Sequence, residues 1–258
     1  MAADAALLEV DRVSKSFGGL QALDGVSLTV RAGDLVGLIG PNGSGKSTLF
    51  NVISGFYRPD QGEVRLDGRP LTGLRPDAVA RRGLVRTFQL ARPLSSLTVY
   101  ETLLVAAPSA FGGSPWRSLL SPSRAWVSDR VRQRAEELLA LTGLHAVRDH
   151  LSTQLSYGQQ KLLSLAAAVM AEPRVLLLDE PMAGVNPTLG QTLRRAIRAL
   201  HAQGLTFLIV EHDMEFVMEM CRTVYVLDRG RVIASGTPQQ VQADPAVVTA
   251  YLGGDAGD

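Results

Sequence analysis

Apolar residues near the start of the chain occur in short runs, separated by turns that contain glycine. Runs at residues 7–13, 26–30 and 34–40 are rich in Val, Leu and Ile, which favours strands. A turn at residues 58–62 precedes a further short strand at 63–68. The first part of the chain is therefore expected to be largely β structure.

Strand and helix patterns alternate in the last third of the chain. Strands are predicted at 174–179, 205–210 and 223–228, and helices lie between them near 188–202 and 213–222. Such alternation is typical of a parallel sheet with helices on both faces. The fold class is therefore α/β.

The middle of the chain has a different pattern. A strand candidate at 83–89 is followed by a helix whose N-cap is Thr98, and later by helical stretches at 129–142 and 158–171. Between them, residues 108–124 contain three prolines, two glycines and five serines, which predicts a loop. We expect one domain over 1–258, with a core formed by 1–89 and 166–258 and a mainly helical subdomain at 90–165.

Bulk composition narrows the class of protein. The net charge of +1 gives no support for a nucleic-acid partner, and a single cysteine, Cys221, excludes an intramolecular disulfide. The start lacks the basic and apolar regions of a signal peptide. The longest apolar run, 162–171, is interrupted by Ser164 and is far shorter than the ~20 residues of a membrane span. We expect a soluble, cytoplasmic protein.

The segment GPNGSGKST, residues 40–48, lies between a predicted strand and a helix with Leu49, Val52 and Ile53 on one face. Its spacing fits G-x-x-x-x-G-K-[ST], the phosphate-binding P-loop. Lys46 would reach the β- and γ-phosphates of a nucleotide, and the Ser47 hydroxyl would bind Mg²⁺. The loop residues expected to contact ATP are Asn42, Gly43, Ser44, Gly45, Lys46, Ser47 and Thr48.

The alternative for this segment is a glycine-rich turn with a solvated lysine. The chain has 26 Lys and Arg residues, yet only Lys15, Lys46 and Lys161 are lysines. At this position the compact point charge of a lysine fits better than a wide arginine guanidinium would. Composition therefore favours the nucleotide interpretation.

Polar residues follow three predicted strands. Asp179 ends the apolar run RVLLLDE and can hold Mg²⁺ through its water shell, while Glu180 can polarise an attacking water. Gln89 can touch metal and water, and His212 can donate to a γ-phosphate. Each residue alone is more often a polar strand end, but together with the P-loop they predict phosphoryl chemistry.

The segment LSYGQQ, residues 155–160, opens a helix. Ser156 is in an N-cap position and Gly158 permits close backbone approach, so the segment predicts a second phosphate-binding helix start. An ordinary capped helix is the alternative. Because one molecule needs one cradle for its own nucleotide, the second cradle would serve a nucleotide held by another subunit.

These motifs, in this order, resemble the ATP-binding subunits of ABC transporters over nearly the whole chain. The family's P-loop NTPase core carries an N-terminal antiparallel β subdomain and a helical subdomain with the ABC signature. The matching positions are Walker A at 40–48, the Q-loop at Gln89, the signature at 155–159 including Gln159, Walker B at 175–179, the catalytic glutamate at Glu180 and the switch histidine at His212. Phe17 falls where the family stacks an aromatic ring on adenine; a core aromatic is its alternative.

Two positions depart from the general family pattern. Tyr157 stands where LSGGQ has its first glycine, and Asn186, in AGVNP, stands where the D-loop usually has an aspartate. Together with GLVRTFQ, EHDM and AYLGG, they resemble the LivG-type subunit of branched-chain amino acid importers. Importers of urea and short amides use a closely similar subunit.

The resemblance implies an ATPase that pairs head to tail with a second ABC subunit, a paralogue or another copy. Lys46, Gln89, Glu180 and His212 would carry the chemistry, with Ser47, Gln89 and Asp179 at the Mg²⁺. Further implied partners are two membrane-spanning permease subunits and, through them, a substrate-binding protein. The chain would then lie at the cytoplasmic face of the cell membrane. A soluble ABC ATPase outside transport and a P-loop kinase are the alternatives.

Overall fold

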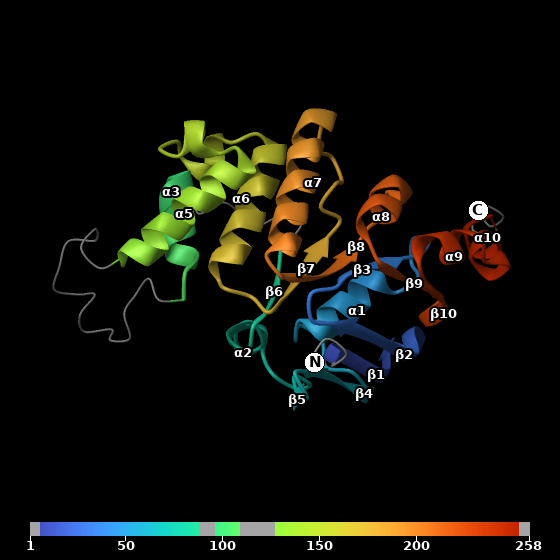
Figure 1. Ribbon diagram of the computed structural model, residues 1–258. Coiled ribbons are helices and arrows are strands. Elements are labelled where there is room, and N and C mark those ends of the chain that lie inside the picture. The colour runs from blue at the N-terminus through green and yellow to red at the C-terminus, as the bar shows by residue number, and fades with distance from the viewer. Residues whose placement is uncertain (1–5, 88–95, 109–126, 253–258) are drawn as a thin grey trace. The chain divides into compact units, whose positions relative to one another are not determined.

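The computed structural model describes residues 6–87, 96–108 and 127–252 (Figure 1). The chain separates into two compact units. The core unit comprises Met1–Arg86, Arg174–Glu180 and Leu200–Asp258, and the helical unit comprises Thr87–Pro173 and Pro181–Ala199. The segment 90–165, expected to be helical, lies within the helical unit, which also takes in 166–173 and 181–199.

The core unit contains two sheets. The strands are β1 (Ala6–Phe17), β2 (Leu20–Arg31), β3 (Leu35–Ile39), β4 (Gln61–Leu66), β5 (Arg69–Pro70), β6 (Leu84–Arg86), β7 (Val175–Asp179), β8 (Thr206–Val210), β9 (Thr223–Asp228) and β10 (Arg231–Gly236). The antiparallel sheet has the order β2-β1-β4-β5, and the second sheet the order β10-β9-β3-β8-β7-β6. In the second sheet only β10 is antiparallel to its neighbour. The predicted α/β fold with an antiparallel N-terminal sheet is confirmed.

Helices cover both faces of the mainly parallel sheet, as predicted. Helix α1 (Lys46–Ile53) lies between the two sheets (Figure 1), and its buried side chains join one apolar core with Val36 and Leu38 of β3. Gly37, between them in β3, faces the opposite side, where Val217 of α8 lies 3.5 Å from the position that a Cβ would take. The remaining helices of this unit are α2 (Pro76–Arg81), α8 (Met214–Met220), α9 (Pro238–Gln242) and α10 (Pro245–Leu252).

Helices of the helical unit agree closely with the sequence pattern. They are α3 (Val99–Ala106), α5 (Asp129–Thr142), the 3-10 turns η1 (His145–Val147) and η2 (Ser152–Gln154), α6 (Tyr157–Met170) and residues 187–199 of α7 (Pro187–Ala202). Thr98 is the N-cap of α3 and forms a reciprocal capping box with Glu101, as its sequence position predicts. Helix α5 has the bounds that the pattern gave it.

Some boundaries differ from expectation. Strands β1 and β2 extend well beyond the runs at 7–13 and 26–30, since antiparallel pairing continues through their polar residues as far as Phe17 and Leu20. Within the strand candidate at 83–89, Leu84–Arg86 form β6, and residues 88 and 89 lie outside the described part of the chain. None of the helices in the part of the chain that the structure describes is long and apolar enough to span a bilayer.

Candidate nucleotide site

Helix α1 begins without a side-chain cap. Its N-cap, Gly45, has a left-handed backbone with φ of 107°, and no side chain accepts a hydrogen bond from the first turn. The backbone N–H groups of Lys46, Ser47 and Thr48 have no hydrogen-bond partner within the described residues. Unpaired donors at the positive end of a helix are the physical basis of an anion site.

The glycines of the P-loop have different reasons to be glycine. A Cβ on Gly40 would lie 2.0 Å from the carbonyl oxygen of Leu227, and one on Gly45 would lie 2.5 Å from that of Ala22. Close packing of the loop on the ends of strands thus excludes a side chain at both positions. At Gly43, with φ of 76°, a Cβ would meet no described atom within 4 Å. Gly43 is exposed and leaves open space beside the unpaired donors.

Lys46 is folded back on the loop. Its ammonium nitrogen donates to the carbonyl oxygens of Gly40 and Pro41, both at 2.8 Å. Burial lowers the pKa of Lys46, while the charges of Glu180 and Asp179 oppose that shift. The lysine is therefore a buried cation facing two carboxylates, with donors that a phosphate can take over from neutral carbonyls.

Asp179 is held by an arginine that the sequence analysis did not single out. Nη2 of Arg86 donates to Oδ2 of Asp179 at 2.6 Å, and Nη1 donates to Oδ1 of Asn51 at 2.7 Å. The Arg86 and Asp179 side chains are 12% and 4% exposed, and the guanidinium carbon lies 5.6 Å from the ring centroid of Phe50. Only the long-range pairing of β6 with β7 brings this charge pair together.

Glu180 leaves the strand in a direction that strand alternation would not give it. Its φ is 45°, a left-handed conformation that is uncommon for a residue with a side chain, and its N–H donates to the carbonyl of Val210 at 2.9 Å. The carboxylate of Asp179 and the exposed hydroxyl of Ser47 are oxygen ligands that suit a hydrated Mg²⁺. The residues present thus fit a nucleotide with its metal.

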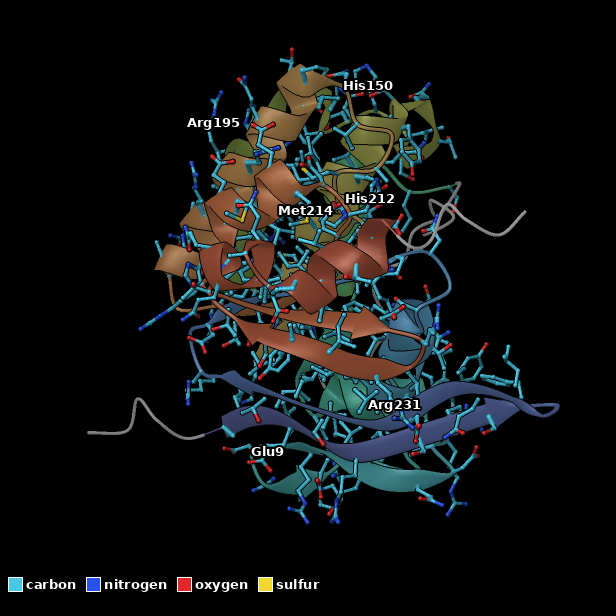
Figure 2. The ribbon with its side chains drawn as sticks, turned by 90° about the vertical axis from the view of Figure 1, so that its right-hand side faces the viewer. Glu9, His150, Arg195, His212, Met214 and Arg231 are labelled. Carbon is cyan, nitrogen blue, oxygen red and sulfur yellow. The ribbon has the colours of Figure 1, made fainter. Side chains whose placement is uncertain are left out.

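His212 lies just ahead of α8, next to the labelled Met214 in Figure 2. Its side chain is 64% exposed, whereas Glu211 is fully buried. An oxygen of Glu211 accepts from the backbone N–H groups of His212 and Asp213, at 3.0 and 3.3 Å. Glu211 was also missed by the sequence analysis, although a carboxylate directly before the predicted histidine was a usable signal.

Phe17 is not a core aromatic, because 42% of the residue is exposed. The Tyr57 ring meets it edge to face at a centroid distance of 5.2 Å, and the Lys15 ammonium lies 5.3 Å from the Phe17 centroid. Lys15 is itself fixed by Asp60 at 2.8 Å. The ring is supported at the end of β1 and keeps an exposed surface for stacking.

The start of α6 is capped, as Ser156 predicted, and the cap is reciprocal. Oγ of Ser156 accepts from the Gln159 N–H at 3.4 Å, and Oε1 of Gln159 accepts from the Ser156 N–H at 2.9 Å. Gly158 is buried, and a Cβ there would lie 2.6 Å from Cδ1 of Leu189. Packing against α7 is thus a sufficient reason for this glycine, independent of any phosphate.

The core unit therefore contains most of the predicted site. Phe17, the loop 40–48, Asp179, Glu180 and His212 all belong to it, whereas Ser156, Gly158 and Gln159 belong to the helical unit. Gln89 lies outside the described residues.

Tyr251 of α10 reaches the P-loop at the backbone of Gly40. Burial raises the pKa of Tyr251, and a hydrogen bond with the Gly40 backbone opposes that shift.

Comparison with known proteins decides the family. The family described as ABC transporter matches residues 23–183, and a second, described as branched-chain amino acid ATP-binding cassette transporter, matches residues 231–257. The chain belongs to the ABC transporter ATP-binding family. Within this family, the probable branched-chain amino acid transport protein LivG of Archaeoglobus fulgidus is 39% identical over 249 residues, covering 96% of this chain and 95% of the relative.

Two further members of the ABC family support the same assignment. The high-affinity branched-chain amino acid transport protein LivG of Escherichia coli K12 is 39% identical and covers 96% of this chain and 98% of its own length. A crystal structure of the ADP conformation of an ABC transporter cassette matches with a TM-score of 0.82 and 38% identity, covering 96% of this chain and 99% of that chain. The predicted ABC fold is confirmed.

Proposed function

We propose that this chain is the ATP-binding and ATP-hydrolysing subunit of an importer for branched-chain amino acids. The observation that carries the choice of substrate class is the match of residues 231–257 to the branched-chain amino acid cassette family. Both LivG relatives named above carry that description in their names and match over almost their whole length.

The core unit supplies most of the residues for the ATP-hydrolysing reaction. The free N–H groups of the first turn of α1 and the ammonium of Lys46 bind the phosphates, and Phe17 stacks on the adenine. When bound there, Mg²⁺ would neutralise charge on the phosphates. Asp179, Ser47 and Gln89 would hold the metal. Glu180 accepts a proton from the attacking water, and His212 donates to the terminal phosphate.

The helical unit serves a second subunit in this proposal. The first turn of α6, with Ser156, Gly158 and Gln159, contacts the nucleotide bound to a partner ABC subunit, whether a paralogue or another copy. One P-loop already accommodates the chain's own nucleotide, so a second cradle has its use in trans. ATP then favours the closed pair of subunits, which is how its binding drives a conformational change.

The remaining partners follow from the role. Two membrane-spanning permease subunits hold the chain at the cytoplasmic face of the cell membrane, and a substrate-binding protein outside delivers the amino acid. Residues 1–258 act as one ABC ATPase domain, with a core at 1–89 and 166–258 and a helical subdomain at 90–165.

Uptake by the reconstituted complex tests the substrate class. The chain is purified with its permease and ATPase partners, placed in liposomes with ATP inside, and supplied with the binding protein and radiolabelled leucine, urea or acetamide. We expect ATP-dependent accumulation of leucine alone, and none when Glu180→Gln replaces the wild-type chain. Accumulation of urea or acetamide in place of leucine would move the complex to the amide branch.

A further inference from the structure

The first turn of α6 is joined to the loop that follows β7, residues 181–186. The ammonium of Lys161 donates to the carbonyl oxygens of Pro181 at 3.2 Å and Ala183 at 2.6 Å. All of these residues belong to the helical unit, and Lys161 is partly buried. One side chain of α6 thus fixes the loop backbone at two carbonyl groups.

Tyr157 covers the same loop from the side. Gly184 has φ of 68°, and a Cβ there would lie 3.0 Å from Cε1 of Tyr157. The ammonium of Lys161 lies 5.3 Å from the centroid of the Tyr157 ring, within the range of a cation–π contact. The ring therefore rests on the loop at Gly184. A side chain at position 184 would strain the left-handed backbone and would also crowd the Tyr157 ring.

The far end of the loop meets α6 as well. Oδ1 of Asn186 accepts from the N–H of Leu189 at 3.0 Å, so Asn186 caps the first turn of α7. Leu189 is the residue whose side chain packs on Gly158. Both departures from the general family pattern, Tyr157 and Asn186, thus lie in one cluster of contacts between the α6 start and the loop.

We infer that Tyr157 and Lys161 are positioning residues that lock the loop 181–186 to the first turn of α6, so that the loop and this turn move as one body. The inference deepens the proposed function and rests on it, because its use is to present the loop and the α6 start together to the partner's nucleotide. A glycine at position 157, as in LSGGQ, could not provide this contact.

Hydrogen exchange of the full-length chain measures the lock directly. The Val185 N–H donates to the Met182 carbonyl across the loop at 3.2 Å, so its exchange reports loop opening. We expect Tyr157→Ala to speed exchange of this amide by about fivefold, the size of one lost ring contact, and Lys161→Met by about tenfold or more, because two hydrogen bonds to the loop are lost. Tyr157→Phe and Lys161→Arg should retain the wild-type rate.

The choice of alanine controls for helix stability, since alanine favours a helix more than tyrosine does. Gln160→Met is the matched control, because the Gln160 side chain donates to Leu155 and not to the loop. Unchanged Val185 exchange in both Tyr157→Ala and Lys161→Met, or equal acceleration in Gln160→Met, would overturn the lock.

A double-substitution cycle tests the contact at Gly184. Gly184→Ala strains the backbone in any background, but it also collides with the Tyr157 ring. In the Tyr157→Ala background the collision is absent, so Gly184→Ala should accelerate Val185 exchange severalfold less than it does in the wild type. Equal acceleration in both backgrounds contradicts a direct contact.

Steady-state kinetics of the assembled ATPase separate positioning from mere stability. Tyr157→Ala and Lys161→Met should lower kcat about fivefold at an unchanged KM for ATP, with recovery in Tyr157→Phe and Lys161→Arg. Faster exchange without a change in kcat rejects the positioning role. The exchange result is independent of which substrate the liposomes accumulate, so failure of the importer proposal and failure of the lock are distinguishable.

Discussion

Two helices of this chain begin at sequences that predict phosphate binding, and they begin differently. Helix α1 starts at Gly45 with no side-chain cap, and the first N–H groups are unpaired within the described residues. Helix α6 starts at Ser156, whose side chain and that of Gln159 take up donors of the first turn. Both sequences are glycine-containing loops before an apolar helix, so pattern alone does not separate them.

The difference shows which start is ready for a ligand. At α1, a phosphate meets donors that lose no internal hydrogen bond on binding. At α6, a phosphate competes with a capping box, so part of the gain from each new contact is offset by the loss of a cap worth about 1 kcal/mol. The α1 start is suited to hold a nucleotide by itself, and the α6 start fits its proposed role of adding contacts when another subunit closes over it.

The largest expected effect concerns the chemistry of hydrolysis, for which all of the proposed residues except Gln89 belong to the core unit. Glu180→Gln should reduce ATP turnover by about 10²–10⁴-fold, the usual contribution of a general base, and leave nucleotide affinity intact. Phosphate release and binding of a fluorescent ATP analogue measure the two quantities. Glu172→Gln, the same substitution at an exposed carboxylate of the helical unit, is the control. Near-wild-type turnover in Glu180→Gln would falsify the role of Glu180.

A pair of substitutions tests whether the two helix starts serve different nucleotides. Lys46→Ala should weaken the chain's own ATP binding by about 2–5 kcal/mol, because a buried charged contact is lost. Ser156→Arg should leave that binding intact and block closure over the partner's nucleotide. Trapping of labelled nucleotide at each composite site distinguishes the two. If Ser156→Arg abolishes ATP binding by the isolated, folded chain, the α6 start contacts the nucleotide at the P-loop of the same chain, and the head-to-tail model is wrong.

A smaller effect is expected at the adenine end of the core site. Phe17→Ala should weaken ATP binding by about 1–3 kcal/mol, the scale of stacking between a base and an aromatic ring, and Phe17→Tyr should change it little. Titration of both variants with ATP and with inorganic triphosphate provides the control, since triphosphate has no base. A loss of affinity that is equal for the two ligands would contradict stacking.

The smallest expected effect distinguishes two roles of Ser156, as the N-cap of α6 and as a contact for the partner's phosphate. Ser156→Ala removes the cap and should lower the free energy of unfolding by about 0.5–2 kcal/mol, whereas Ser156→Asp keeps a good cap and most of the stability. Urea unfolding measures both. In the assembled ATPase the order should reverse, because the aspartate repels the partner's phosphate while the alanine does not. Equal turnover of the two variants would show that no phosphate approaches Ser156.

Local signals predicted a large part of the fold and of the site. The capping position of Thr98, the bounds of α5 and the strand–loop–helix at the P-loop depend on residues a few positions apart, so the sequence displays them directly. Arg86 could not be found in this way. Its partners Asn51 and Asp179 are 35 and 93 positions distant, and only the order of strands in the sheet unites them.

The sequence by itself determined which residues are proposed for phosphate chemistry, because a P-loop is a local arrangement of backbone donors, glycine and lysine. Tertiary structure alone decided why particular residues must be what they are. Gly40 is small because the Leu227 carbonyl approaches it, and Gly158 because Leu189 does. Tyr157, a departure from a motif when only the sequence is considered, is a contact of the loop at Gly184 in three dimensions. Packing joins residues that are distant along the chain, and no local pattern records which of them will meet.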